Sequence, residues 1–201
     1  MRRFPLLPRK KDTDKSHYGH VFVLAGSRTM PGAAALASLA ALRAGSGLVT
    51  LGIPKSLRGY RYKFPLEVMQ LGLPETAAGS VGRAAYPRVT EFIRRRKINC
   101  VVIGPGLSQE AGTAALVRRL VAQLEIPIVL DADGLNGFRG RVRLLKDHRL
   151  PLVLTPHREE FERLFGEKWP EGLRRRAALA KRLSAFYDGV LVLKGRRTLV
   201  V

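Results

Sequence analysis

Apolar residues along this chain gather in short runs, and longer amphipathic or alanine-rich segments separate these runs. Six of the runs are nearly continuous in apolar residues and short enough to be strands buried on both faces. They lie at 21–25, 48–53, 100–103, 126–130, 152–154 and 190–193. Segment 66–71 is predicted to be an edge strand, and 198–201 begins a further extended segment.

The intervening segments carry the signals of helices. Alanine and leucine, which favour helices, fill the segment that follows Pro31 and ends at Gly45. Helices are predicted at 33–44, 87–97, 109–124, 158–165 and 170–187. Strands that alternate with helices, and that have no wet face, predict an α/β fold with a mostly parallel central sheet and helices on both faces. We expect one domain over 16–201, preceded by a basic flexible lead at 1–15.

Turn-forming or polar residues follow the predicted strands. In a parallel sheet the carboxyl ends of the strands share one edge, so residues far apart in sequence are expected to meet there. The segments are Gly26-Ser27, Gly104-Pro105-Gly106, Asp131-Ala132-Asp133, Thr155-Pro156-His157 and Lys194-Gly195. The first segment lacks the Gly-Lys-Ser/Thr ending of a P-loop, and the second lacks the third glycine of a dinucleotide fingerprint.

Each segment, taken singly, leaves alternatives open. Asp131 and Asp133 are suited to bind a cation, and equally to cap the following helix. A lone histidine such as His157 more often packs at a helix start than binds a ligand. Lys194, next to a glycine after a strand, can offer an ammonium and free backbone N–H groups to a phosphate.

Composition and charge narrow the class of protein. Hydrophobic residues make up 46% of the 201 residues, as in a globular protein, and no stretch is long and apolar enough to span a bilayer. The start of the chain lacks the apolar region of a signal peptide, and the single cysteine, Cys100, favours a cytoplasmic protein. The net charge of +20 admits nucleic-acid binding as an alternative, but the basic residues are scattered and lack interleaved aromatic residues.

Five motifs together resemble the NAD(P)H-hydrate dehydratases of the ribokinase-like superfamily, in order and in spacing, from about Lys15 onward. They are AGSRTMPGAAALASLAALRAGSGLV, VVIGPGLS, VLDADGLN, LTPHREEFERL and VLVLKGRRT. Arg158-Glu159 stands where the family usually has Pro-Gly, and Asp133-Gly134 where it usually has Asp-Ala. The resemblance implies a three-layer ribokinase-like fold.

The family's activity is the repair of hydrated NADH or NADPH. ADP or ATP phosphorylates the hydroxyl on the nicotinamide ring, and phosphate then leaves as the double bond is restored. By resemblance, Ala33, Gly106 and His157 contact the hydrate, and Glu160 holds the Mg²⁺ and phosphate network. The nucleotide-phosphate segment comprises Lys194, Gly195, Arg196, Arg197 and Thr198. A homotetramer is implied as well.

The family's catalytic segment, a Gly-Thr-Gly-Asp turn with the Asp as base, does not occur in residues 1–201. We therefore expect the last part of the fold to lie beyond Val201, and the chain as given to be inactive or slow. A small-molecule kinase of the same superfamily is the first alternative. A basic nucleic-acid-binding protein on a degenerate enzyme fold is the second.

Overall fold

The computed structural model describes residues 11–149 and 151–201, and for 60–63 it describes the backbone alone. Most of the predicted flexible lead at 1–15 therefore lies outside the described residues. Its last residues form a turn, and a 3₁₀ helix, η1 (Lys15–Tyr18), follows with Asp14 as its N-cap. The predicted domain boundary stays a prediction.

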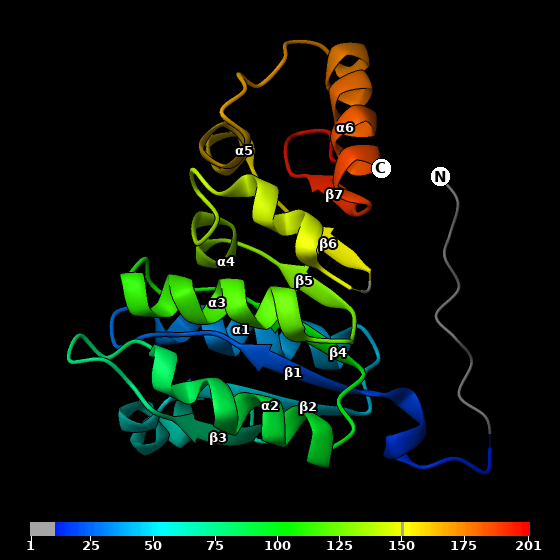
Figure 1. Ribbon diagram of the computed structural model, residues 1–201. Helices are drawn as coiled ribbons and strands as arrows, with labels where there is room; N and C mark the ends of the chain where they lie inside the picture. Colours follow the sequence, from blue (N-terminus) through cyan, green and yellow to red (C-terminus); the bar gives the residue numbers. More distant parts are fainter. Residues whose placement is uncertain (1–10, 150) are drawn as a thin grey trace.

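The strands form one eight-stranded sheet (Figure 1). Its order is β3-β2-β1-β4-β5-β6-β7-β8, and every neighbouring pair is parallel except β7 and β8. The predicted α/β fold with a mostly parallel sheet is confirmed. The strands are β1 (His20–Leu24), β2 (Leu48–Pro54), β3 (Met69–Leu73), β4 (Cys100–Ile103), β5 (Ile128–Leu130), β6 (Leu152–Leu154), β7 (Val190–Leu193) and β8 (Leu199–Val200).

Helices connect the strands, close to the predicted positions. The α-helices are α1 (Pro31–Arg43), α2 (Tyr86–Arg95), α3 (Ala111–Gln123), α4 (Asp133–Asn136), α5 (Arg158–Phe165) and α6 (Leu173–Tyr187). Short 3₁₀ helices also occur at η2 (Lys55–Lys63), η3 (Arg83–Ala85) and η4 (Val142–Asp147). Helix α4 and these 3₁₀ helices were not predicted, because segments this short carry too few apolar positions to show a period.

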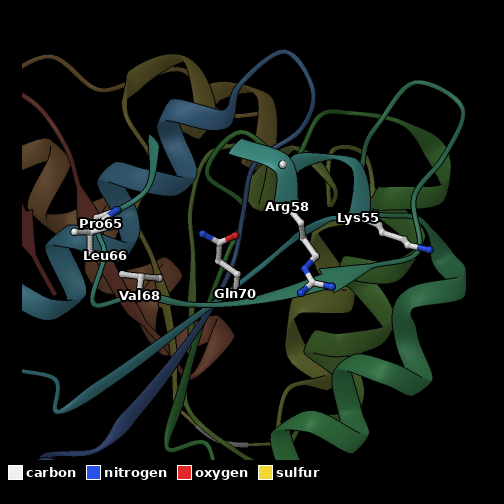
Figure 2. Close-up of a pocket in the computed structure, with 7 residues that line it drawn as sticks. Lys55, Arg58, Pro65, Leu66, Val68 and Gln70 are labelled. Carbon is white, nitrogen blue, oxygen red and sulfur yellow. The ribbon is translucent and has the colours of Figure 1, made fainter. Parts of the chain in front are cut away.

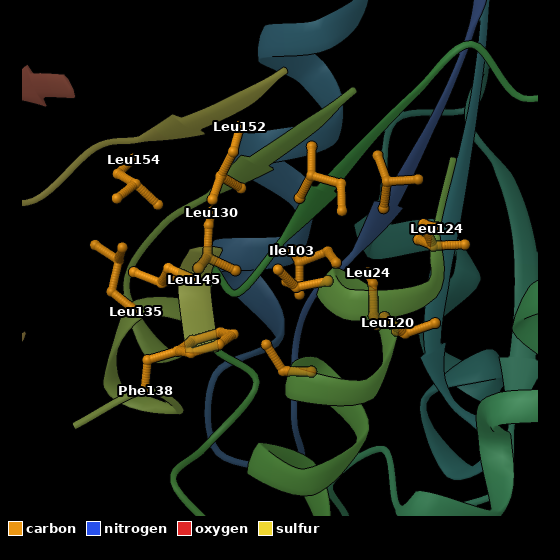
Figure 3. Packing of buried hydrophobic residues seen from close by; sticks show 14 of the residues in the cluster. Leu24, Ile103, Leu120, Leu124, Leu130, Leu135, Phe138, Leu145, Leu152 and Leu154 are labelled. Atoms are coloured by element: carbon orange, nitrogen blue, oxygen red, sulfur yellow. The ribbon is translucent and has the colours of Figure 1, made fainter. Parts of the chain in front are cut away.

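The larger part of the core lies on one face of the sheet. Side chains from alternate positions of β1 and β4–β7 pack there against α2, α3, α5 and α6, with Phe22, Phe138 and Phe161 fully buried. Figure 3 shows Leu24, Ile103 and Leu130, from three neighbouring strands, in this layer. Because these helices pack against the strands, they hold the ends of the loops that follow the strands in place.

The other face is covered by α1, which lies behind β1 and β4 in Figure 1, and by η2. The register of the neighbouring strands places four valines side by side on this same face, and they are Val102, Val129, Val153 and Val190. These valines are partly exposed, and Val190 reaches 38%. Strands β4–β7 are thus fully covered on one face and half covered on the other, which differs from the expectation of strands buried on both faces.

The predicted edge strand is real but lies further along the chain. Strand β3 begins at Met69, whereas the prediction began at Leu66, which is 86% exposed. The prediction began too early because it relied on apolar residues alone, and Leu66 and Val68 are apolar. These residues belong to the turn before β3, in which the carbonyl of Pro65 accepts a hydrogen bond from the N–H of Val68. Segment 198–201 contains β8, which folds back antiparallel on β7.

Candidate functional site

The loops after β1, β4 and β5 are joined to each other at the carboxyl edge of the sheet. The N–H of Gly26 donates to the carbonyl of Pro105 at 2.8 Å, and the N–H of Gly104 donates to that of Leu24 at 3.1 Å. The N–H of Asp131 donates to the carbonyl of Ile103, also at 3.1 Å. The predicted meeting of these loops at one edge is therefore confirmed.

Gly106 and Ala33 touch across this edge. A Cβ built on Gly106 would lie 2.9 Å from the Cβ of Ala33 and 2.9 Å from the Cβ of Met30, and Gly106 has a φ of +67°. A side chain is thus excluded both by the backbone conformation and by the space. Because Gly106 lacks a Cβ, the turn after β4 lies directly on the first turns of α1.

The next loop is a strained turn that separates two carboxylates. Ala132 has φ 50° and ψ −119°, a conformation that non-glycine residues rarely adopt. On one side of it, Asp131 Oδ1 accepts hydrogen bonds from Thr155 Oγ1 at 2.6 Å and Lys194 Nζ at 2.7 Å. On the other side, Asp133 Oδ2 accepts the N–H of Ser108 at 2.9 Å.

The capping alternative for these aspartates is wrong. The N-cap position of α4 is Ala132, and no side chain caps the helix. Asp131 instead links the loop after β5 to Thr155 and Lys194, which follow β6 and β7. Asp133 links the same loop to Ser108, in the loop after β4. The strain at Ala132 is what directs the two carboxylates apart.

His157 and Glu160 form a reciprocal cap at the start of α5. His157 Nδ1 accepts from the N–H groups of Glu159 and Glu160, and Glu160 Oε2 accepts from the N–H of His157 at 2.9 Å. Since Nδ1 is an acceptor, the ring proton of a neutral His157 is on Nε2, which lies 3.2 Å from Glu160 Oε1. The expectation that His157 sits at a helix start is confirmed, yet its side chain remains 44% exposed and accessible to a ligand.

Lys194 links this cap to the strained turn. Its Nζ lies 2.7 Å from Asp131 Oδ1 and 3.6 Å from Oε2 of Glu160, a side chain that is only 7% exposed. Free backbone N–H groups were predicted at Lys194-Gly195, and for Lys194 this prediction is wrong. Its N–H donates to the carbonyl of Pro156 at 2.9 Å, which ties β7 to the loop after β6.

The rest of the predicted phosphate segment forms the exposed turn between β7 and β8. Gly195, Arg196, Arg197 and Thr198 are all exposed, and Thr198 Oγ1 donates to the carbonyl of Gly195 at 3.4 Å. Among hydrogen bonds between described residues, none uses the N–H of Gly195, Arg196 or Arg197 as donor. The turn can therefore offer backbone donors to an anion.

The predicted residues thus fall into two contiguous groups on one edge. Ala33 and Gly106 lie over β1 and β4, while His157, Glu160 and Lys194 lie over β6 and β7. The Asp131–Asp133 turn of β5 stands between the groups. Thr155 and Ser108 had no predicted role, although both lie in the quoted motifs. Thr155 directly follows β6, and Ser108 lies in the loop after β4.

A pocket of 680 Å³ lies elsewhere, between η2 and β3. Figure 2 shows Lys55 and Arg58 on one side of it and Pro65 and Leu66 on the other. None of its lining residues belongs to the cluster at the carboxyl edge. We take the carboxyl edge as the candidate functional site, because Asp131 and Glu160, the Lys194 ammonium that both approach, and His157 lie there.

Comparison with known proteins settles the family. Residues 21–201 match the model of the Carb_kinase family, described as NAD(P)H-hydrate dehydratase. The chain belongs to the NAD(P)H-hydrate dehydratase family. The match includes both groups of the carboxyl edge.

Individual relatives of the chain lead to the same family. A bifunctional NAD(P)H-hydrate repair enzyme Nnr from Moorella thermoacetica is 38% identical over 195 residues, which cover 96% of this chain and 36% of that protein. The ADP/ATP-dependent NAD(P)H-hydrate dehydratase from Bacillus subtilis, co-crystallised with ATP/Mg²⁺, matches with a TM-score of 0.75 and 28% identity over 96% of this chain and 64% of its own. A ribokinase-like superfamily protein from Enterococcus faecalis, 24% identical with a TM-score of 0.75 over 96% of this chain and 63% of its own, shares the fold.

The chain therefore spans about a third of the length of the bifunctional relative and less than two thirds of these two solved chains. Among the described residues, no helix is long and apolar enough to cross a membrane.

Proposed function

We propose that this chain takes part in the dehydration of hydrated NADH or NADPH back to the reduced dinucleotide, with ADP or ATP as phosphoryl donor. The hydroxyl oxygen on the hydrated ring attacks the terminal phosphorus of the nucleotide and loses its proton. The bond from that phosphorus to the bridging oxygen breaks, so that ADP leaves as AMP or ATP leaves as ADP. The phosphorylated oxygen then leaves as phosphate, a ring proton is released, and the double bond returns. Family membership supports the reaction class, and the geometry of the edge supports the division of roles.

The hydrate is assigned to the Ala33–Gly106 contact and to His157. The close contact of Gly106 with Ala33 fixes the backbone of the turn after β4 at the edge. The side chain of His157 is 44% exposed, with its Nε2 beside Glu160 Oε1. The nucleotide phosphates are assigned to Lys194 and the exposed turn at 195–198. An ammonium and backbone N–H groups there would stabilise the charge of the transferring phosphoryl group.

The residues present are compatible with Mg²⁺. No cluster of three or more metal-binding side chains occurs among the described residues, but Asp131 and Glu160 both approach the Lys194 ammonium. Mg²⁺ at phosphate-transfer sites is commonly held by one or two carboxylates, with waters and phosphate oxygens as the other ligands. Asp131 and Glu160 would hold such an ion, whose role is to neutralise phosphate charge. Assembly into a homotetramer remains a prediction from the resemblance, and a cytoplasmic location remains a prediction from the single cysteine and the start of the sequence.

The observation that carries the proposal is the ion-paired cluster of Asp131, Glu160 and Lys194 beside His157 on the same edge as the Ala33–Gly106 contact. The test incubates the chain with hydrated NADH, Mg²⁺ and either ADP or ATP, and follows the absorbance of the reduced nicotinamide. Recovery that requires both nucleotide and Mg²⁺ supports the proposal. A stable phosphorylated product without recovery would instead indicate a kinase.

Because residues 1–201 contain no Gly-Thr-Gly-Asp run, binding is measured alongside turnover. Isothermal titration with ADP and with hydrated NADH shows whether each half of the site is functional. If neither ligand binds, the proposed function is wrong.

A further inference from the structure

Arg176 places its guanidinium beside the proposed phosphate turn. It extends from the first turns of α6, and its Nη1 lies 3.8 Å from the position that a Cβ of Gly195 would occupy. Its Cζ lies 5.5 Å from the centre of the Trp169 ring. The guanidinium is thus held between an aromatic ring and a glycine that leaves space at the turn.

Within the part of the chain that the structure describes, Arg176 lacks the side-chain partners that Arg163 and Arg182 have. Arg163 donates to Asn136 and faces Glu159, and Arg182 donates to both oxygens of Glu167 at 2.7–2.8 Å. Arg176 Nε, by contrast, is buried and has no hydrogen-bond partner among the described residues. Buried polar groups are almost always satisfied, so an orphaned donor calls for an explanation.

The charges around the turn point to an anion as the missing partner. The two carboxylates of the cluster, Asp131 and Glu160, are both directed at Lys194, and Glu162 Oε1 accepts the backbone N–H of Trp169 at 2.9 Å. Arg196 and Arg197 are exposed on the same turn and add positive charge. A planar guanidinium matches two phosphate oxygens at once, whereas a single ammonium binds as a point charge.

We propose that Arg176 is a further phosphate-binding residue of the donor-nucleotide site, brought by α6 to the glycine side of the turn between β7 and β8. The proposal rests on the proposed function, because that function places a nucleotide at this turn. Trp169 lies against the guanidinium, and Gly195 places no side chain between the guanidinium and the turn. Arg176 lies outside the five motifs, so the sequence comparison with the family gave it no role.

The structure also supplies an optical probe. Trp169 is the single tryptophan of the chain, and its ring edge lies 4.0 Å from the Cβ position of Gly195. A nucleotide that binds at the turn and engages Arg176 changes the charge next to this ring. Its fluorescence in the wild-type protein is therefore expected to change with ADP concentration, with the midpoint equal to the calorimetric Kd.

The experiment compares ADP affinity, by isothermal titration, in wild-type protein, Arg176→Ala, Arg176→Lys and Arg175→Ala. Arg175 is the matched control, since it precedes Arg176 on the same helix, is exposed and carries the same charge. Loss of a charge-assisted, two-pronged contact is expected to weaken ADP binding about tenfold to a hundredfold in Arg176→Ala. Arg176→Lys should recover only part of the loss, and Arg175→Ala should change Kd by less than about twofold.

The salt dependence distinguishes a phosphate contact from a structural role. The slope of log Kd against log salt concentration should fall in Arg176→Ala and stay unchanged in Arg175→Ala, because one fewer cation meets the phosphates. An unchanged Kd in Arg176→Ala, or an equal loss in Arg175→Ala, overturns the proposal. If the wild-type protein itself binds no ADP, the nucleotide site of the proposed function fails, a result distinct from normal wild-type binding with an unaffected Arg176→Ala.

Discussion

The Nζ of Lys194 lies 2.7 Å from Oδ1 of Asp131, although 63 positions separate the two residues in sequence. The buried carboxylate of Glu160 approaches the same ammonium at 3.6 Å. Two strand ends and the start of a helix thus position one cation at the carboxyl edge of the sheet. A phosphate that binds at the turn after β7 meets an ammonium whose position is already fixed, and this lowers the entropy lost on binding.

Lys194→Met should weaken ADP binding about tenfold to a hundredfold, because a charge-assisted contact is lost from the phosphates. Lys181→Met is the control, since Lys181 is exposed on α6 and removes the same charge from the protein. Isothermal titration gives both affinities. Equal affinities in the wild type and Lys194→Met would show that the ammonium serves only its two carboxylates.

Gly106→Ala should lower the free energy of unfolding by about 2–4 kcal/mol, from the positive φ together with overpacking. The added Cβ would lie 2.9 Å from Ala33 and from Met30. Gly140→Ala separates the two effects, because Gly140 has nearly the same φ, +68°, and no atom within 4 Å of the added Cβ. It should cost about 1 kcal/mol.

Urea unfolding measures both glycine variants, and titration with hydrated NADH measures the consequence for the site. Gly106→Ala is expected to lose the hydrate while retaining ADP binding, since the phosphate turn lies over β7. Gly140→Ala is expected to bind both. Normal hydrate binding by a folded Gly106→Ala protein would contradict the assignment of the hydrate to the Ala33–Gly106 contact.

His157 has two separable roles, as N-cap of α5 and as a proposed contact to the hydrate. His157→Asn keeps an efficient cap and should leave stability nearly unchanged, whereas His157→Ala should cost about 1 kcal/mol. Both variants remove the exposed Nε2 and should therefore weaken hydrate binding alike. Thermal unfolding and hydrate titration test the two roles in parallel. If hydrate affinity followed stability, with Asn like wild type, the histidine would be a cap alone.

The sheet could be predicted from the sequence because its strands are short and apolar and its helices are long enough to show a period. The meeting of Gly106, His157 and Lys194 at one edge followed from parallel topology. Both groups of site residues, and the motifs that contain them, could therefore be identified from the sequence alone. Two starts moved along the chain: β3 begins at Met69 because the turn at Leu66 is itself apolar, and α6 begins at Leu173 rather than at Pro170.

The sequence could not predict which hydrogen bonds and ion pairs form at the carboxyl edge of the sheet. Whether Asp131 caps a helix or pairs with Lys194 depends on the strained backbone at Ala132, which no local preference of alanine indicates. The N–H of Lys194 is occupied by Pro156, a contact made between strands. Arg176 is one of three consecutive arginines, and only the packing of α6 shows which of them reaches the turn.

The stability of the protein should fall as the pH drops below 6.5, because of His20. Burial, with a smaller contribution from the charge of Arg96, lowers the pKa of His20 below its ordinary value of 6.5. Its Nε2 is hydrogen-bonded to Thr50 Oγ1 at 2.8 Å inside the protein. Between the lowered pKa and 6.5, the unfolded chain binds a proton that the folded chain does not, so stability rises with pH across this window and is lost as pH falls.

His20→Gln removes this titration while keeping a group that can hydrogen-bond to Thr50. Urea midpoints measured across the window should slope downward with acid in the wild-type protein and less steeply in His20→Gln. Arg96→Gln should also reduce the slope, since it removes the positive charge that disfavours a charged His20. Identical slopes in the wild type and His20→Gln would mean that other groups set the acid sensitivity, and that the buried imidazole is not the one whose protonation opposes folding.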